Sequence, residues 1–168
     1  MIRLARPSDL RHLAAIEDAA CGLLEAYLGS VAGGPLAFPT PSGGQRDLNG
    51  TLLVTQYGPE LVGFAHLTTP DGHAHLDQVS VLPAHSRQGI GRALVLAVME
   101  EARWAGYDEI SLCTFAEVPF NAPFYASLGF TETAELAWFQ VRLRDIETAL
   151  GLDEMGPRIV MSAPLGRR

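Results

Sequence analysis

The chain has 168 residues, of which 48% are hydrophobic and 18% charged, so it can bury the core of one domain and is not a disordered tail. Its formal net charge of -7 at pH 7 opposes the attraction to phosphate on which general nucleic-acid binding rests. No apolar run reaches the roughly 18 residues of a membrane span, the amino terminus MIRLARPSDL lacks a secretory signal, and two cysteines are too few for a disulfide framework.

The first quarter of the chain predicts a strand, a helix and a loop. Residues 1–6 are short and partly apolar, and Pro7-Ser8-Asp9 then supplies a capping hydroxyl or carboxylate where a helix can begin. An apolar stripe at helical spacing runs to about residue 27 and consists of Leu10, Leu13, Ile16 or Glu17, Ala20 and Leu24. Residues 33–50 are rich in glycine and proline, so we predict a loop that is either functional or mobile.

Three strand-like runs follow and predict an antiparallel meander. They cover residues 51–57, 61–68 and 73–81. Gly58-Pro59-Glu60 and Pro70-Asp71-Gly72 are typical turn sequences between them. Because these turns are too short for a crossover helix, consecutive strands must run in opposite directions.

The second half alternates helices and strands. A helix follows residue 92 and ends before Gly106, which stands where a helix C-cap belongs. Further strands are predicted at residues 108–115, near 130–134 and at 158–163, and further helices at 121–127 and near 136–150. The order β-α-β-β-β-α-β-α-β-α-β predicts an α/β fold of the α+β type, with a mixed sheet, in a single domain covering residues 1–168.

The junction before the longest helix of this half has the properties of an anion cradle. In the segment RQGIGR, Gly89 and Gly91 let the chain turn tightly and present N–H groups at a helix N-terminus. Arg87 and Arg92 could support a pyrophosphate there, although an ordinary strand-to-helix turn is the alternative. No Lys-Ser/Thr pair follows the glycines, and Leu94 occupies the third glycine position of a dinucleotide fingerprint, so neither of those motifs fits.

Two segments resemble the GNAT superfamily of N-acetyltransferases. HLDQVSVLPAHSRQGIGRAL, residues 75–94, resembles its acetyl-CoA-binding motif, and NAPFYASLGF, residues 121–130, resembles its second motif. The resemblance implies a GNAT-like acyl-CoA N-acyltransferase fold, with an antiparallel meander, a splayed parallel strand pair and flanking helices. Ser86 departs from the pattern, which usually has Gln or Arg there; its backbone N–H could still meet a phosphate, and Arg87 could compensate.

The resemblance also implies a binding site for acetyl-CoA, with CoA as the product. The strand near residues 75–81 would carry a bulge and splay from its parallel neighbour, so that the pantetheine arm pairs with exposed backbone. The residues expected to bind the cofactor are Val79, Ser80, Val81, Arg87, Gln88, Gly89, Ile90, Gly91, Arg92, Ala93, Asn121 and Phe124. Core packing is the alternative role of the two valines, and a helix N-cap that of Asn121.

Acetyl transfer to an amine needs a base for the ammonium proton and an acid for the departing thiolate. Tyr125 matches the family position of the acid, with a half-buried core tyrosine as the alternative. Asp77 is the first choice for the base, acting directly or through water, and His75 and Glu117 are the other candidates. The N–H of Val79 could stabilise the oxyanion.

We expect no metal at this site, because the reaction needs none. His73, His75 and Asp77 alternate along a strand and could share a face, which resembles half of a metal site. Cys113 is interpreted as a buried core thiol rather than a nucleophile. All twelve basic residues are arginines, so a lysine Schiff base is excluded.

The expected function is an N-acetyltransferase that moves an acetyl group from acetyl-CoA to a primary amine by direct transfer in a ternary complex. The acceptor would be a small molecule or a peptide, bordered by residues 33–50 and 136–150. Four aromatic residues could form an apolar wall of the acceptor site, or could instead belong to the core or to a dimer interface: Phe38, Phe120, Trp138 and Phe139. A non-catalytic CoA-binding or regulatory module is the alternative, and a nucleotide-phosphate binder the third. We expect a cytoplasmic protein without nucleic-acid or membrane partners; the family often forms homodimers.

Overall fold

A computed structural model describes residues 1–29 and 39–166. It contains a seven-stranded sheet in the order β1-β2-β3-β4-β5-β7-β6. The strands are β1 (Ile2–Leu4), β2 (Thr51–Tyr57), β3 (Glu60–Thr68), β4 (Ala74–Val81), β5 (Glu109–Phe115), β6 (Thr131–Glu132) and β7 (Arg158–Pro164). The helices are α1 (Leu10–Leu28), α2 (Gly43–Asp47), α3 (Ile90–Trp104), α4 (Ala122–Ala126) and α5 (Trp138–Ala149). The predicted order of elements is confirmed, with α2 added and boundaries within three residues of those expected.

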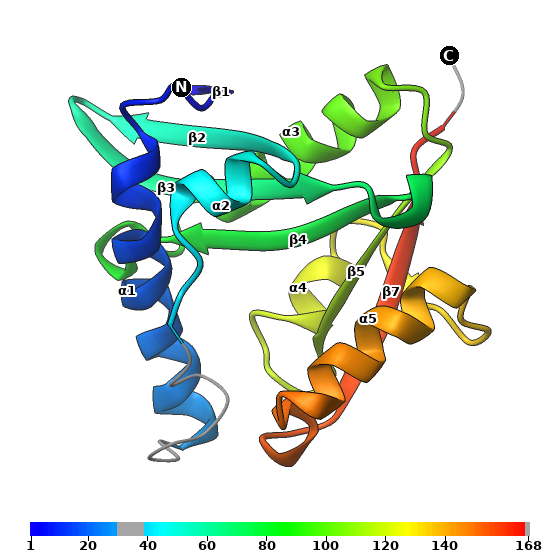
Figure 1. Cartoon of the computed structure of the whole chain (residues 1–168). Coiled ribbons are helices and arrows are strands. Elements are labelled where there is room, and N and C mark those ends of the chain that lie inside the picture. The colour runs from blue at the N-terminus through cyan, green and yellow to red at the C-terminus, as the bar shows by residue number, and fades with distance from the viewer. Residues whose placement is uncertain (30–38, 167–168) are drawn as a thin grey trace.

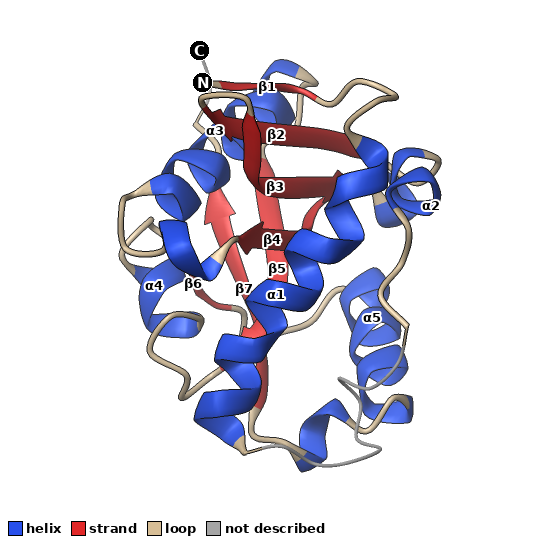
Figure 2. Ribbon diagram, turned by 90° about the vertical axis from the view of Figure 1, so that its left-hand side faces the viewer, coloured by secondary structure: helices blue, strands red, loops and turns tan. Residues whose placement is uncertain are grey.

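The helices cover the sheet on both faces. In Figure 1, α1, α2 and α5 lie in front of the strands, and α3 and α4 lie behind them. Figure 2 shows that β5 and β7 run across the direction of β2–β4, so the sheet opens into two parts. β4 and β5, the only parallel neighbours among the described strands, stand at the junction between these parts.

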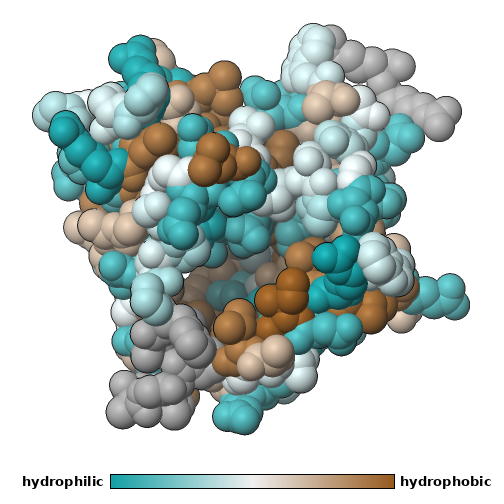
Figure 3. Space-filling view, in the orientation of Figure 1, coloured by the Kyte–Doolittle hydropathy of each residue, from teal (hydrophilic) through white to brown (hydrophobic). Residues whose placement is uncertain are grey.

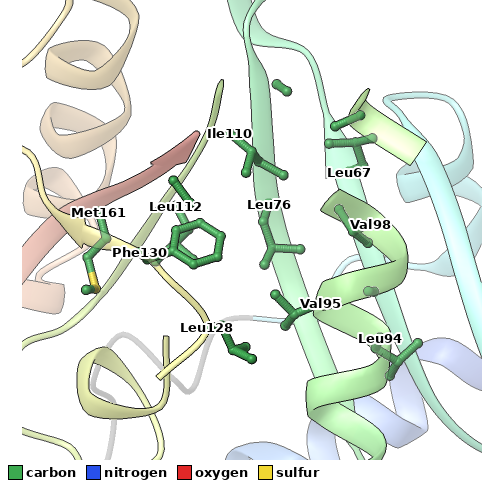
Figure 4. Close-up of a cluster of buried hydrophobic side chains, with 14 of the residues drawn as sticks. Leu67, Leu76, Leu94, Val95, Val98, Ile110, Leu112, Leu128, Phe130 and Met161 are labelled. Atoms are coloured by element: carbon green, nitrogen blue, oxygen red, sulfur yellow. The ribbon is translucent and has the colours of Figure 1, made fainter. Parts of the chain in front are cut away.

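Each covered face has its own core. Behind the sheet, α3 packs on the strands and on the segment after α4 through a cluster that includes Leu94, Leu112 and Phe130 (Figure 4). In front, Leu13 of α1 packs on β2 and β3, where Phe64 is fully buried. Burial of these apolar faces is the main driving force that holds the helices to the sheet.

Two local predictions are wrong in detail. Asp9 stands before α1 but makes no side-chain cap; its carboxylate accepts hydrogen bonds from the Arg6 N–H at 2.7 Å and the Arg3 guanidinium at 2.6 Å. Within the predicted loop, residues 43–47 form α2. This helix starts with a capping box, in which the Ser42 hydroxyl accepts from the Gln45 N–H and the Gln45 side chain accepts from the Ser42 N–H.

The predicted bulge and splay are both present. β4 and β5 pair only at Ala74 with Ile110 and at His75 with Ser111, and beyond this point they diverge. Along the other edge of β4, Leu76 and Gln78 face consecutive residues of β3, so Asp77 is the extra residue of a β-bulge. The bulge therefore lies directly where the two strands separate.

Candidate functional site

The turn before α3 presents a row of backbone donors. Arg87 and Gly89 adopt left-handed conformations, with φ of 59° and 79°. The first helical hydrogen bond runs from the Ala93 N–H to the Gly89 carbonyl, and no described residue accepts from the backbone N–H groups of residues 87–92. The guanidinium groups of Arg87 and Arg92 are exposed and form no ion pair within the described chain. This arrangement can bind an anion at the helix N-terminus.

Ser86 does not contribute to this row. Its N–H and its hydroxyl both donate to the Pro83 carbonyl, at 3.1 Å and 2.8 Å. The prediction that its N–H points at a phosphate is therefore wrong, because a local turn already uses that donor. The available donors begin at Arg87.

The edge of β4 that faces the splay carries free backbone groups. The Leu82 N–H donates to the Val62 carbonyl of β3, and successive residues of a strand direct their backbone groups to opposite edges. Val79 and Val81 therefore turn their backbone groups toward the gap, while their side chains pack against the α3 core. Ser80 differs from the prediction, because by the same alternation its backbone faces β3, and its buried hydroxyl accepts from the Gln78 amide.

α4 brings the second motif to this gap. A Cβ placed on Gly91 would lie 3.8 Å from Phe124 and 3.9 Å from Val81, so the glycine turn, the β4 edge and α4 meet here. The Asn121 side chain does not cap α4; its Oδ1 accepts from the Thr114 hydroxyl at 3.0 Å. No described residue accepts from its Nδ2, which is left as a donor for a ligand.

Tyr125 is a protonated phenol in an apolar setting. Its ring lies between Phe124 and Phe130, with centroids 5.1 Å and 5.9 Å away. Burial raises the pKa of Tyr125 to about 12. The hydroxyl therefore keeps its proton at neutral pH and can donate it.

The three candidate bases lie in different environments. Asp77 has a side chain that is 41% exposed, and its Oδ2 accepts from Arg46 Nη1 at 2.8 Å and lies 3.0 Å from Nδ1 of His66. Burial pushes the pKa of Asp77 up, but the hydrogen bond and charge of His66 and the charge of Arg46 outweigh it, so this pKa lies below its usual value. His75 is buried with Nδ1 2.9 Å from the Ser111 hydroxyl, and burial lowers its pKa. Glu117 is exposed in the loop before α4.

The ion pair between Asp77 and Arg46 extends to a second, buried carboxylate, that of Glu17. The sequence did not predict this cluster. Arg46 of α2 bonds both carboxylate oxygens of Glu17 through Nη2, at 2.8 Å and 2.7 Å. Burial raises the pKa of Glu17 despite this pairing. The glutamate in the apolar stripe of the first helix was the available signal, because a carboxylate at a core position needs a buried partner.

The front surface is hollowed below β4, between α1 and α5 (Figure 3). The expected apolar wall is only partly exposed to it. Phe139 is buried and stacks on His73 with centroids 4.3 Å apart, so it belongs to the core. Trp138 and Phe120 are exposed, and they contact Arg142 and Tyr27 respectively. Phe38 lies outside the described residues.

The described residues hold no group of three His, Cys, Asp or Glu side chains that could bind a metal. His73, His75 and Asp77 point to separate partners: a phenylalanine ring, a serine and an arginine. Cys113 is half-buried, and burial raises its pKa to about 12, so it is a thiol at neutral pH. No helix in residues 1–29 or 39–166 is long and apolar enough to cross a bilayer.

Comparison with known proteins places this geometry in a family. A model described as "Acetyltransferase (GNAT) family" matches residues 13–130. "N-acetyltransferase family 8 member 3" of Rattus norvegicus is 37% identical over 71 residues, which are 42% of this chain and 31% of that protein. "N-acetyltransferase 8F1" of the same species is 29% identical over 109 residues, 59% of this chain and 49% of that protein. The chain thus spans less than half the length of these curated relatives.

Solved structures share the fold at low sequence identity. The ribosomal-protein-S18-alanine N-acetyltransferase from Escherichia coli has a TM-score of 0.68 and 21% identity, covering 100% of this chain and 95% of that one. PaiA N-acetyltransferase from Thermoplasma acidophilum, in complex with coenzyme A, has a TM-score of 0.70 and 16% identity, covering 98% of both chains. N-acetylglutamate synthase from Neisseria gonorrhoeae, complexed with coenzyme A and N-acetyl-glutamate, has a TM-score of 0.69 and 19% identity, covering 99% of this chain and 35% of that one.

Proposed function

Because the chain belongs to the acetyltransferase (GNAT) family, we propose that it transfers an acetyl group from acetyl-CoA to a primary amine by direct transfer in a ternary complex. The observation that carries the proposal is a convergence at the β4–β5 splay. The turn with the free backbone donors, the free edge of β4 and Phe124 of α4 meet beside this splay. Tyr125 follows Phe124 in α4, and Asp77 is the bulge residue of β4.

The residues around the gap fit acetyl-CoA. The N–H groups of residues 87–92, with Arg87 and Arg92, match a pyrophosphate, because donors and positive charge are both available there. The backbone of Val79 and Val81 can pair with the pantetheine amides as an added strand. The remaining proposed binding residues are Gln88, Gly89, Ile90, Gly91, Ala93, Asn121 and Phe124.

Each catalytic role is assigned to a group whose protonation suits it. Bound acetyl-CoA supplies the activated acyl carbon and the thiolate leaving group. Tyr125 donates its phenolic proton to the departing thiolate, and the Val79 N–H stabilises the developing oxyanion. Asp77, as an exposed anion beside the gap, accepts the ammonium proton directly or through water. His75 is less suited because it is buried and bonded to Ser111.

A binding experiment tests the cofactor first. Thermal unfolding is followed with acetyl-CoA, CoA, ATP and NAD, each alone. A ligand at 100 times its dissociation constant adds about 2.7 kcal/mol of stability, so we expect a clear rise in Tm with acetyl-CoA and CoA only. A rise with ATP or NAD instead would favour a nucleotide-phosphate binder.

A turnover experiment then separates the enzyme from its alternative. CoA release is measured with a panel of amines that includes amino acids, peptide N-termini and small alkylamines. We expect intersecting double-reciprocal plots, as direct transfer requires, whereas parallel plots would indicate a covalent intermediate. The alternative, a CoA-binding module, predicts binding without release of CoA for any amine.

A further inference from the structure

Helix α2 brings a buried guanidinium to the bulge of β4. Arg46 has a side chain that is 7% exposed, and it reaches Asp77 from 31 positions away in the sequence. α2 packs on the same face of the sheet as α1, in front of β2 and β3, and the hollow lies on the other side of β4 (Figures 1 and 3). The buried arginine therefore reaches Asp77 of β4 from the side opposite the hollow.

The contacts leave one carboxylate oxygen of Asp77 open. Arg46 Nη1 and His66 Nδ1 both approach Oδ2, at 2.8 Å and 3.0 Å, and no described residue donates to Oδ1. Asp77 is also the only member of the group with an exposed side chain, at 41%, against 10% for Glu17 and 3% for His66. Oδ1 is thus the atom that an incoming amine or its water can reach.

The guanidinium itself is held in one position. Glu17 binds Nη2 through both carboxylate oxygens, and the Arg46 guanidinium carbon lies 5.7 Å from the centre of the Phe64 ring. The backbone on each side of the arginine is also packed closely: a Cβ on Gly43 would lie 2.1 Å from the Leu10 carbonyl oxygen, and one on Gly50 would lie 2.9 Å from Nε2 of His66. Such packing leaves α2 little freedom to move.

The charges show why the group suits a cation. Two carboxylates share one guanidinium, and Glu17 occupies the edge of Arg46 that does not face Asp77. Arg46 therefore orients Asp77 while its charge is shared between two carboxylates, so Asp77 keeps part of its attraction for an ammonium group.

We infer that Arg46 is a positioning residue, which fixes the Asp77 carboxylate so that Oδ1 meets the cationic amine of the acceptor. The inference rests on the proposed function, because it assigns Arg46 an effect that acts only through Asp77. Glu17 has the supporting role of fixing Arg46.

A double-mutant cycle tests this dependence. R46M, D77N and R46M/D77N are compared by kcat and kcat/KM with acetyl-CoA and the best amine of the panel. We expect D77N to lower kcat by about 10²-fold, a usual contribution of a general base. R46M should lower kcat in the wild-type background and have no further effect in the D77N background.

The pH profile provides a readout that a structural role would not move. Removal of a neighbouring positive charge raises the pKa of a carboxylate, so the acid limb of kcat should move to higher pH in R46M by about one unit. E17Q should move it in the opposite direction, because it removes a neighbouring negative charge.

Two further variants control for folding. R46M leaves the Glu17 carboxylate buried without its partner, so E17Q/R46M removes both charges together. R3M breaks a comparable pair, Arg3 with Asp9, at the β1–α1 corner and should leave kcat and its pH profile unchanged. The Tm of every variant is measured beside its kinetics.

The outcomes separate the inference from the proposed function. Multiplicative losses from R46M and D77N, with an unmoved acid limb in R46M, would overturn the inference and leave the enzyme in place. An unaffected kcat in D77N would remove Asp77 from the reaction and the inference with it. A wild-type protein that binds CoA and acetylates no amine would overturn both.

Discussion

The phenol of Tyr125 can be tested by removal of a single oxygen. Tyr125→Phe keeps the ring between Phe124 and Phe130 and deletes the proposed proton donor. We expect kcat to fall by about 10²-fold, while the affinity for acetyl-CoA stays unchanged. Steady-state rates and direct binding measure the two effects. Tyr107→Phe, a half-buried tyrosine beside the same core, is the matched control and should keep full activity.

The raised pKa of the same residue predicts the alkaline side of the pH profile. Since burial places the pKa of Tyr125 at about 12, the phenol remains protonated through pH 9. We therefore expect no loss of kcat from this group between pH 7 and pH 9. A falling limb in that range that disappears in Tyr125→Phe would show that the phenol ionises earlier than its burial implies.

At the scale of elements, α2 depends on one glycine and not on its neighbour. A Cβ on Gly43 would lie 2.1 Å from the Leu10 carbonyl oxygen, whereas one on Gly44 would meet nothing nearer than 4.0 Å. Gly43→Ala should therefore destabilise the protein by about 1–3 kcal/mol and weaken catalysis by displacing Arg46. Gly44→Ala, the matched control, should be neutral or slightly stabilising. Urea unfolding and kcat measure both; equal effects of the two variants would contradict the packing argument.

The same helix shows where prediction from sequence ends. Strands such as β2 and the end of α3 at Gly106 depend on local periodicity and turn residues, and both lie where expected. α2 does not, because Gly43 and Gly44 disfavour a helix and only its cap and its packing stabilise it.

The candidate site divides in the same way. The cradle and Tyr125 could be located because each belongs to a short contiguous motif. The partner of Glu17 could not, because residues 29 positions apart meet only after α1 and α2 pack together. The sequence could not predict the hydrogen bonds of Ser86 either. Both of its donors bond the Pro83 carbonyl, three positions away, and the sequence does not specify the backbone conformation of this turn.

On the scale of the whole molecule, the sheet is continuous across β4 and β5 at two residue pairs only. Ala74 pairs with Ile110 and His75 with Ser111, and the side chains of the second pair add a hydrogen bond of 2.9 Å. The proposed acetyl-CoA site requires β4 and β5 to be separated after His75. The fold requires the same two strands to be paired up to His75. His75 therefore stands at the last position where the two parts of the sheet are connected.

This placement predicts that acid weakens the whole fold through His75. Burial lowers its pKa, against the opposing pull of Asp77 and Glu147, so the native state resists a proton that the unfolded chain accepts near its usual pKa of about 6.5. Neutral His75 therefore contributes its full stability above pH 6.5, the pKa of the unfolded chain. Below that pH the free energy of unfolding falls, by at most about 1.4 kcal/mol per pH unit. Urea unfolding at pH 7.5 and 5.5 should show this loss in the wild type and a smaller loss in His75→Asn. His12→Gln, a change at an exposed histidine, should keep the wild-type loss, and equal losses in all three proteins would place the acid sensitivity away from the β4–β5 junction.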